Sequence, residues 1–150
     1  MFDPETIMDV ELDGSNSTQV IPVPEKDDYI GLIKDEKSII PNKFYNTETG
    51  KTSYSLDIVW HLDDEDAKAV TGKEEPTVRQ KIWLDVTPDG KIDMSEGKNV
   101  GLGRLREAIG KNEGAFSFRD LVGQIAQLRV KHRMNGEDTY AEVRGVKAAA

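Results

Sequence analysis

Three cations alternate along the stretch LRVKHRMNGEDTYAEVRGV, residues 128–146. Because successive side chains of a β-strand point to opposite faces, a strand here would present Arg129, Lys131 and Arg133 on one side. A row of cations with this spacing is suited to the phosphates of a polyanion, whose binding depends largely on Lys and Arg. The first interpretation of this segment is therefore a surface for nucleic acid.

The same segment allows a second interpretation, in which the cations pair with acids on a neighbouring strand. Asn135-Gly136 predicts a hairpin, and a two-residue turn would place Asp138 opposite Arg133, Tyr140 opposite Lys131 and Glu142 opposite Arg129. A four-residue loop would shift these partners but not the faces. Such cross-strand ion pairs form a solvated ladder that contributes a few tenths of a kcal/mol per pair, on the order of 0.2–1. The hairpin alone does not decide between the two interpretations.

A second group of cations surrounds a tryptophan in TVRQKIWLDV, residues 77–86. If its apolar residues of period two face inward, Arg79, Lys81 and Trp83 share the outer face. Aromatic rings among cations hold single-stranded nucleic acid, because bases stack on the rings and phosphates pair with the cations. The alternative for Trp83 is packing beneath the acidic segment of residues 63–76 or against the N-terminal arm.

The loop PNKFYNTETGK, residues 41–51, adds aromatic and basic side chains. In a small barrel, the loop between the first two strands lies beside the face of strands two and three, so we expect these groups to converge there. The candidate nucleic-acid-binding residues are Lys43, Phe44, Tyr45, Lys51, Arg79, Lys81, Trp83, Arg129, Lys131, Arg133 and Tyr140.

The elements that must position these residues follow from hydrophobic periodicity and turn residues. Alternation predicts strands over residues 29–37, 53–62, 77–86, 124–134 and 139–147. Helical spacing of Leu102, Leu105 and Ile109 predicts one helix over residues 99–109. The fold predicted from this order is mainly β: an OB-like five-stranded antiparallel barrel with one α-helix between strands three and four.

The front of the chain has a different composition from the rest. Residues 1–27 are rich in acids and end in a proline-containing run, which predicts an extended acidic N-terminal arm. Residues 28–150 would then form the OB-like nucleic-acid-binding domain. Open strand edges of a partly closed barrel allow subunits to pair, which admits a homodimer.

The net charge of −8 is unevenly distributed. Residues 1–36 contain ten acids and two lysines, whereas residues 98–150 contain ten Lys or Arg and six acids. A basic second half remains compatible with a polyanion partner. The sequence has no cysteine, no signal-like start and no apolar run near the roughly 18 residues of a membrane span, so we expect a cytoplasmic protein, in the host cytoplasm if viral.

Four segments together carry a family resemblance: TGK at residues 49–51, the helix GLGRLREAIGKN, FSFRDLVGQ and the closing YAEVRGV. Over residues 27–147, the chain resembles phage-encoded OB-fold proteins that bind single-stranded DNA. The resemblance implies a non-enzymatic protein that coats displaced strands in DNA replication or recombination. The contacts that it implies are made by Lys51, Arg79, Lys81, Trp83, Arg129, Lys131 and Tyr140.

The chain departs from that family at its termini. Many single-strand binders end in an acidic tail that competes with DNA and recruits partners, whereas the acids here lie at the front. We therefore expect residues 1–28 to compete with DNA for the basic surface. Replication or recombination proteins are the candidate partners of this arm.

Other functional classes find less support in the residues. Gly101 and Gly103 lack the third glycine of a dinucleotide fingerprint, and His61 and His132 lie alone in separate strands. No nucleophile beside a base is recognisable, so we expect no enzyme, no metal and no cofactor. The alternatives to single-stranded DNA binding are a protein-interaction or virion structural module and a DNA-mimicking inhibitor.

Overall fold

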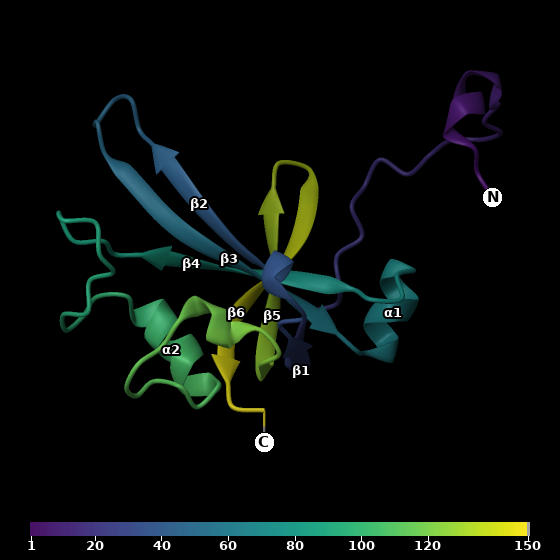
Figure 1. The fold of residues 1–150 in the computed structure, drawn as a ribbon. Helices are drawn as coiled ribbons and strands as arrows, with labels where there is room; N and C mark the ends of the chain where they lie inside the picture. The colour runs from purple at the N-terminus through teal and green to yellow at the C-terminus, as the bar shows by residue number, and fades with distance from the viewer. Residues whose placement is uncertain (150) are drawn as a thin grey trace.

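One six-stranded sheet dominates the computed structural model, which describes residues 1–149 (Figure 1). The strands are β1 (Lys26–Leu32), β2 (Ile39–Tyr45), β3 (Thr52–Leu62), β4 (Thr77–Leu84), β5 (Ile125–Asn135) and β6 (Asp138–Lys147). The helices are α1 (Glu65–Thr71) and α2 (Val100–Ala108), with short 3-10 turns at Pro4–Asp9, Glu36–Ser38 and Phe118–Leu121. The protein is mainly β, as the alternating sequence predicts.

The sheet closes partly into a ring. Its order is β1-β5-β6-β4-β3-β2, and β1 also pairs with β3 through Gly31 and Leu62. A Cβ atom at position 31 would lie 2.9 Å from Trp60 Cε3 and would also overlap Leu128, so the closure depends on the small size of glycine. All neighbouring strands are antiparallel except β4 and β6, which run parallel.

The interior of the ring is packed around Trp60, which is fully buried. Its indole N–H donates to Gln80 Oε1 at 3.0 Å, which satisfies the only polar atom of the ring system. The helix α2 follows β4 and precedes β5 in the chain. Its residues Leu102 and Leu105 are buried in the same core, so this helix covers part of the ring. On the outer face, Phe44 of β2 and Trp83 of β4 are exposed, whereas Ser55 and Asp57 of β3 are buried.

The N-terminal arm extends away from the body of the protein (Figure 1). Residues 1–21 are exposed, whereas Val23 is buried. The backbone N–H of His132 donates to Glu25 Oε2 at 2.7 Å, and this contact lowers the pKa of the Glu25 carboxyl. The Tyr29 hydroxyl donates to the Pro24 carbonyl at 2.7 Å. The arm is thus exposed at its acidic tip and anchored beside β5 at residues 23–25.

Two elements differ from the sequence prediction. The segment predicted as a loop at residues 41–51 contains most of β2, so the sheet has six strands rather than five. Pro41 is tolerated there because β2 is an edge strand.

The acidic connection after β3 contains α1, which the periodicity did not indicate. Asp64 caps this helix by accepting from Ala67 N at 2.9 Å, and Gly72 ends it with φ of 70°. The Lys26 ammonium lies 2.7 Å from Asp64 Oδ2, and this ion pair lowers the pKa of Asp64. The helix is therefore fixed to β1.

Candidate nucleic-acid interface

Trp83 projects from the outer face of β4 and is 57% exposed, while the neighbouring Ile82 is buried. The indole and the Phe44 ring of β2 have centroids 5.8 Å apart and planes tilted by 50°. The Lys81 ammonium lies 5.1 Å from the Phe44 centroid and 5.5 Å from that of Trp83. The ring partner of Trp83 is thus Phe44, rather than the acidic connection or the arm.

Small side chains of β3 leave both rings standing above the sheet. Ser53 is the cross-strand neighbour of Phe44, and Ser55 is that of Trp83. The rings border a shallow hollow of about 520 Å³, whose far side is formed by the β2–β3 loop at residues 46–48. Two exposed rings beside an open hollow have the shape on which planar bases stack.

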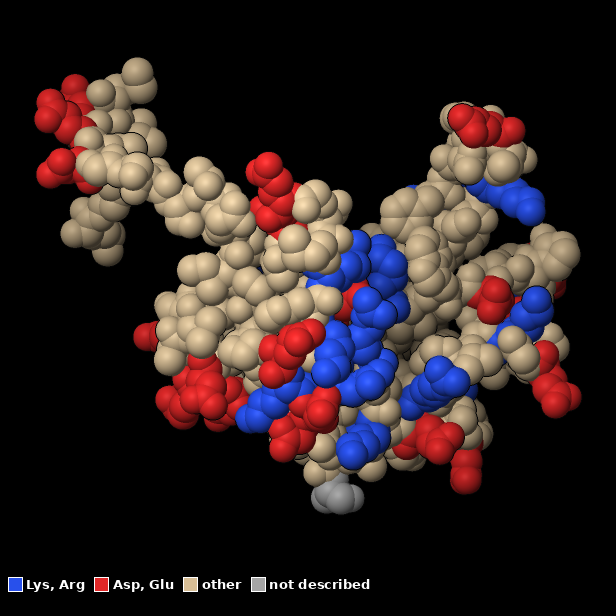
Figure 2. All heavy atoms as spheres, turned by 180° about the vertical axis from the view of Figure 1, so that it is seen from behind, with Lys and Arg blue, Asp and Glu red and all other residues tan. Residues whose placement is uncertain are grey.

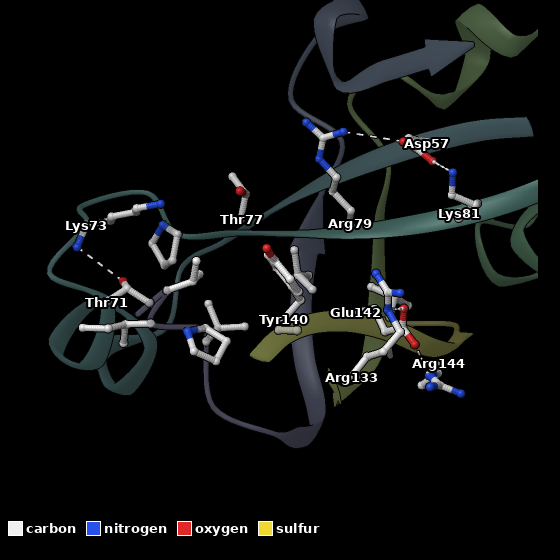
Figure 3. Close-up of a pocket in the computed structure, with 18 residues that line it drawn as sticks. Asp57, Thr71, Lys73, Thr77, Arg79, Lys81, Arg133, Tyr140, Glu142 and Arg144 are labelled. Atoms are coloured by element: carbon white, nitrogen blue, oxygen red, sulfur yellow. Dashed lines mark hydrogen bonds and ion pairs between the residues drawn. The ribbon is translucent and has the colours of Figure 1, made fainter. Parts of the chain in front are cut away.

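Asp57 of β3 lies between two cations on this outer face. Its carboxylate oxygens are 3.5 Å from Arg79 Nη1 and 3.6 Å from Lys81 Nζ (Figure 3). The carboxylate side chain is 13% exposed, whereas those of Arg79 and Lys81 are 63% and 44% exposed. One mostly buried carboxylate therefore pairs with two exposed cations, so the cluster of Asp57, Arg79 and Lys81 presents positive charge to solvent.

Glu142 of β6 repeats this arrangement. Its carboxylate lies 3.2 Å from Arg133 Nε and 2.6 Å from Arg144 Nε. The Glu142 side chain is again less exposed than its two partners, at 29% against 53% and 50%. Since Arg79 and Glu142 form the bridge that joins β4 to β6, the two clusters are adjacent.

The hairpin has the predicted faces but not the predicted partners. Its turn is at Gly136-Glu137, which pairs Arg133 with Tyr140 and Lys131 with Glu142. The expected pairings of Arg133 with Asp138 and of Arg129 with Glu142 are wrong, because the turn begins one residue later than expected.

The remaining two cations of β5 have different surroundings. Lys131 Nζ lies 3.7 Å from Asp27 of β1. Arg129 packs over Gly145, and within residues 1–149 it forms no ion pair. An ion-pair ladder is therefore present in part, yet around Asp57 and Glu142 the cations outnumber the acids.

Figure 2 shows one side of the molecule on which basic side chains gather in a band, with most of the acids at its margins. The outer-face cations of the adjacent β4, β5 and β6 are Arg79, Lys81, Arg129, Lys131, Arg133, Arg144 and Lys147. The acidic tip of the arm lies away from this band in the same view.

The structure brings together eight of the predicted residues on one continuous outer face. These are Phe44, Arg79, Lys81, Trp83, Arg129, Lys131, Arg133 and Tyr140. Lys43 is a correction: it alternates with Phe44 along β2 and so points to the opposite face, because the segment is a strand and not a loop. Tyr45, the last residue of β2, lines the hollow beside Phe44 and Trp83. Lys51 is exposed at the base of the β2–β3 loop, where its carbonyl accepts from Asn46 N at 2.9 Å.

Two members of the face were missed in the sequence. Asp57 has the same parity as Ser53 and Ser55 in β3, but a lone aspartate gives no sign of which strand it will lie beside. Arg144 adopts its position because the β5–β6 register shifts between Arg129 and Val130. A β-bulge of this kind has no signature in this sequence.

The two histidines lie in separate contacts. His132 Nε2 is 2.7 Å from the Val23 carbonyl, and His61 Nε2 is 3.4 Å from Ser38 Oγ.

Over residues 1–149, no helix is both long and apolar enough to cross a membrane. Comparison of the chain with protein-family models gives no match, and comparison with curated proteins gives no significant match.

Proposed function

We propose that the protein binds single-stranded DNA, without catalysis and with little sequence preference, in DNA replication or recombination. The observation that carries this proposal is the exposed Phe44–Trp83 pair with the Lys81 ammonium close to both rings. A base stacked on either ring would have its phosphate beside this cation. Stacking discriminates little among bases because each base offers a π-face.

The architecture supports the same proposal. Residues 33–38, which include the turn Glu36–Ser38, separate β1 from β2, and both strands pair with β3, so the two can be counted as one interrupted first strand. Five strands then remain, with α2 between the third and the fourth. In an OB-like barrel of this kind, the face of strands two and three binds oligonucleotides, and here that face belongs to β3 and β4.

The first test is a titration of a labelled oligo-dT of about 12 nucleotides, a length within the usual site sizes of single-strand binders. We expect affinity to fall steeply between about 50 mM and 200 mM salt, since bound cations displace phosphate counterions. Trp83→Ala should weaken binding by about 1–3 kcal/mol, the usual contribution of one stacked base.

A matched control is Met94→Ala, which removes another exposed apolar side chain from the loop between β4 and α2. This variant should bind as the unchanged protein does. Absence of salt-dependent oligo-dT binding by the unchanged protein would refute the proposal.

A protein-interaction or virion structural module is the second candidate, and one observation favours it. Large apolar side chains of the arm are exposed, including Phe2, Met8 and Leu12 at 60%, 92% and 75%. Exposed apolar residues among acids can anchor a protein partner. This candidate predicts a stable protein complex that survives loss of Trp83 and no binding of oligo-dT.

A further inference from the structure

A groove of about 610 Å³ lies between β4, β6 and the N-terminal arm (Figure 3). β4 and β6 pair at Arg79 and Glu142 and separate beyond that bridge. One wall is the arm segment Val20–Val23, and the connection from α1 to β4 closes one end with Lys73. A groove of this volume is within the range that holds small ligands, roughly 300–1,000 Å³.

The walls of the groove are apolar where the arm contributes. Val20 and Ile21 are 48% and 57% exposed although they lie beside the groove. Tyr140 lines the groove from β6 and is 36% exposed. A groove lined by an aromatic ring and by apolar side chains suits a planar, mostly apolar group such as a nucleobase.

The rim of the groove is basic. Five cations and two acids line it: Lys73, Arg79, Lys81, Arg133 and Arg144, with Asp57 and Glu142. Arginine forks match phosphate oxygens in geometry as well as in charge. Apolar walls with a basic rim therefore fit one nucleotide unit, with the base inside and the phosphate at the rim.

The arm is anchored at Val23 and Glu25, directly after the wall residues Val20 and Ile21. His132 contacts both Glu25 and the Val23 carbonyl, each at 2.7 Å. Pro22 and Pro24 restrict the backbone on either side of the buried Val23. An anchor next to the wall limits how far Val20 and Ile21 can move, and this lowers the entropy cost of enclosing a ligand.

We propose that this groove is a second subsite, in which one nucleotide of the bound strand is enclosed between Tyr140 and the arm residues Val20 and Ile21. The inference rests on the proposed function, since the strand that fills the groove is the strand that stacks on Phe44 and Trp83. It assigns the arm a direct part in binding, through its apolar segment and apart from its acidic tip.

The test is the double variant Val20→Ser with Ile21→Ser, which leaves the charge unchanged. We expect about three- to tenfold weaker oligo-dT binding and faster dissociation, because apolar contact area is lost. The matched control is Val10→Ser with Leu12→Ser, two exposed arm residues that do not line the groove. The control should bind as the unchanged protein does.

A second measurement locates the strand. Oligo-dT carrying one 5-iodouracil is cross-linked by light, and the attached residues are identified by mass spectrometry. We expect cross-links to Tyr140 as well as to Trp83 or Phe44. Loss of affinity in Trp83→Ala, with the double variant equal to its control and no cross-link to Tyr140, would overturn the subsite and leave the proposed function standing. Absence of oligo-dT binding by the unchanged protein would overturn both.

Discussion

At the scale of single residues, Asp57 reduces the positive charge of the proposed interface. It is a mostly buried carboxylate between Arg79 and Lys81, and its Oδ1 atom accepts no hydrogen bond within the described chain. A polyanion that approaches these cations must compete with a carboxylate already in place. The residue therefore orients two cations while reducing their net attraction for phosphate.

Replacing Asp57 by Asn keeps the shape of the side chain and removes its charge. We expect tighter oligo-dT binding at low salt, because both cations become free to pair with phosphate. The slope of log K against log salt should steepen by about 0.7 for each additional phosphate that the protein neutralises. Glu107→Gln on the exposed surface of α2 is the control and should change neither quantity. Weaker binding by Asp57→Asn would mean that orientation of the cations outweighs their attraction.

At the scale of elements, closure of the ring depends on the meeting of β1 and β3. Gly31 is in contact range of Leu128 and Trp60, and both neighbours are fully buried. Neither side chain can withdraw without disturbing the core, because interiors are packed at crystal-like density. Gly31 does not have a positive φ, so glycine is needed here for packing and not for its backbone conformation.

Gly31→Ala should destabilise the fold by about 1–3 kcal/mol through overpacking. The measurement is urea unfolding, with the midpoint shifted and the slope unchanged. Gly103→Ala is a control of opposite sign, because a Cβ there meets nothing within 4 Å and the residue lies inside α2. That variant should be more stable by about 0.5–1 kcal/mol. Equal stability of Gly31→Ala and the unchanged protein would show that the strands close without this contact.

At the scale of the whole molecule, the acidic tip of the arm lies apart from the basic outer face of β4, β5 and β6 (Figure 2). Residues 1–19 contain five acids and no Lys or Arg, and they extend into solvent. The cations lie on β4, β5 and β6. An extended acidic segment attached to a basic face repels a polyanion and can occupy that face itself. Salt weakens both effects, because at 0.1 M exposed charges more than about 10 Å apart are largely screened from one another.

Deletion of residues 1–19 removes these acids and keeps the groove wall at Val20–Val23. We expect tighter oligo-dT binding at low salt and little difference at high salt, because the competition is electrostatic. Changing the five acids to Asn and Gln in the full-length chain should have the same effect, which separates charge from length. Unchanged or weaker binding by both variants at low salt would contradict competition by the arm.

Local patterns were sufficient for part of the fold and of the candidate site. The alternation in β4 correctly placed Lys81 and Trp83 outside, since pleating alone assigns neighbours to opposite faces. Lys43 was placed incorrectly because Pro41-Asn42 resembles a loop, while an edge strand tolerates proline. The hairpin partners were wrong for a similar reason: a turn that begins one residue later changes every pair and leaves the faces as they were.

The sequence by itself determined which side chains face outward in the strands that it predicted, β4 and β5 above all, because the period of two is a property of the extended backbone. Only the tertiary structure decided which strands lie beside one another. It places Phe44 beside Trp83 and Asp57 beside two cations, and it lines one groove with the arm and Tyr140. In each case the residues come from different elements of the chain. Such contacts depend on how the sheet closes, and closure follows from packing of the whole core around Gly31 and Trp60.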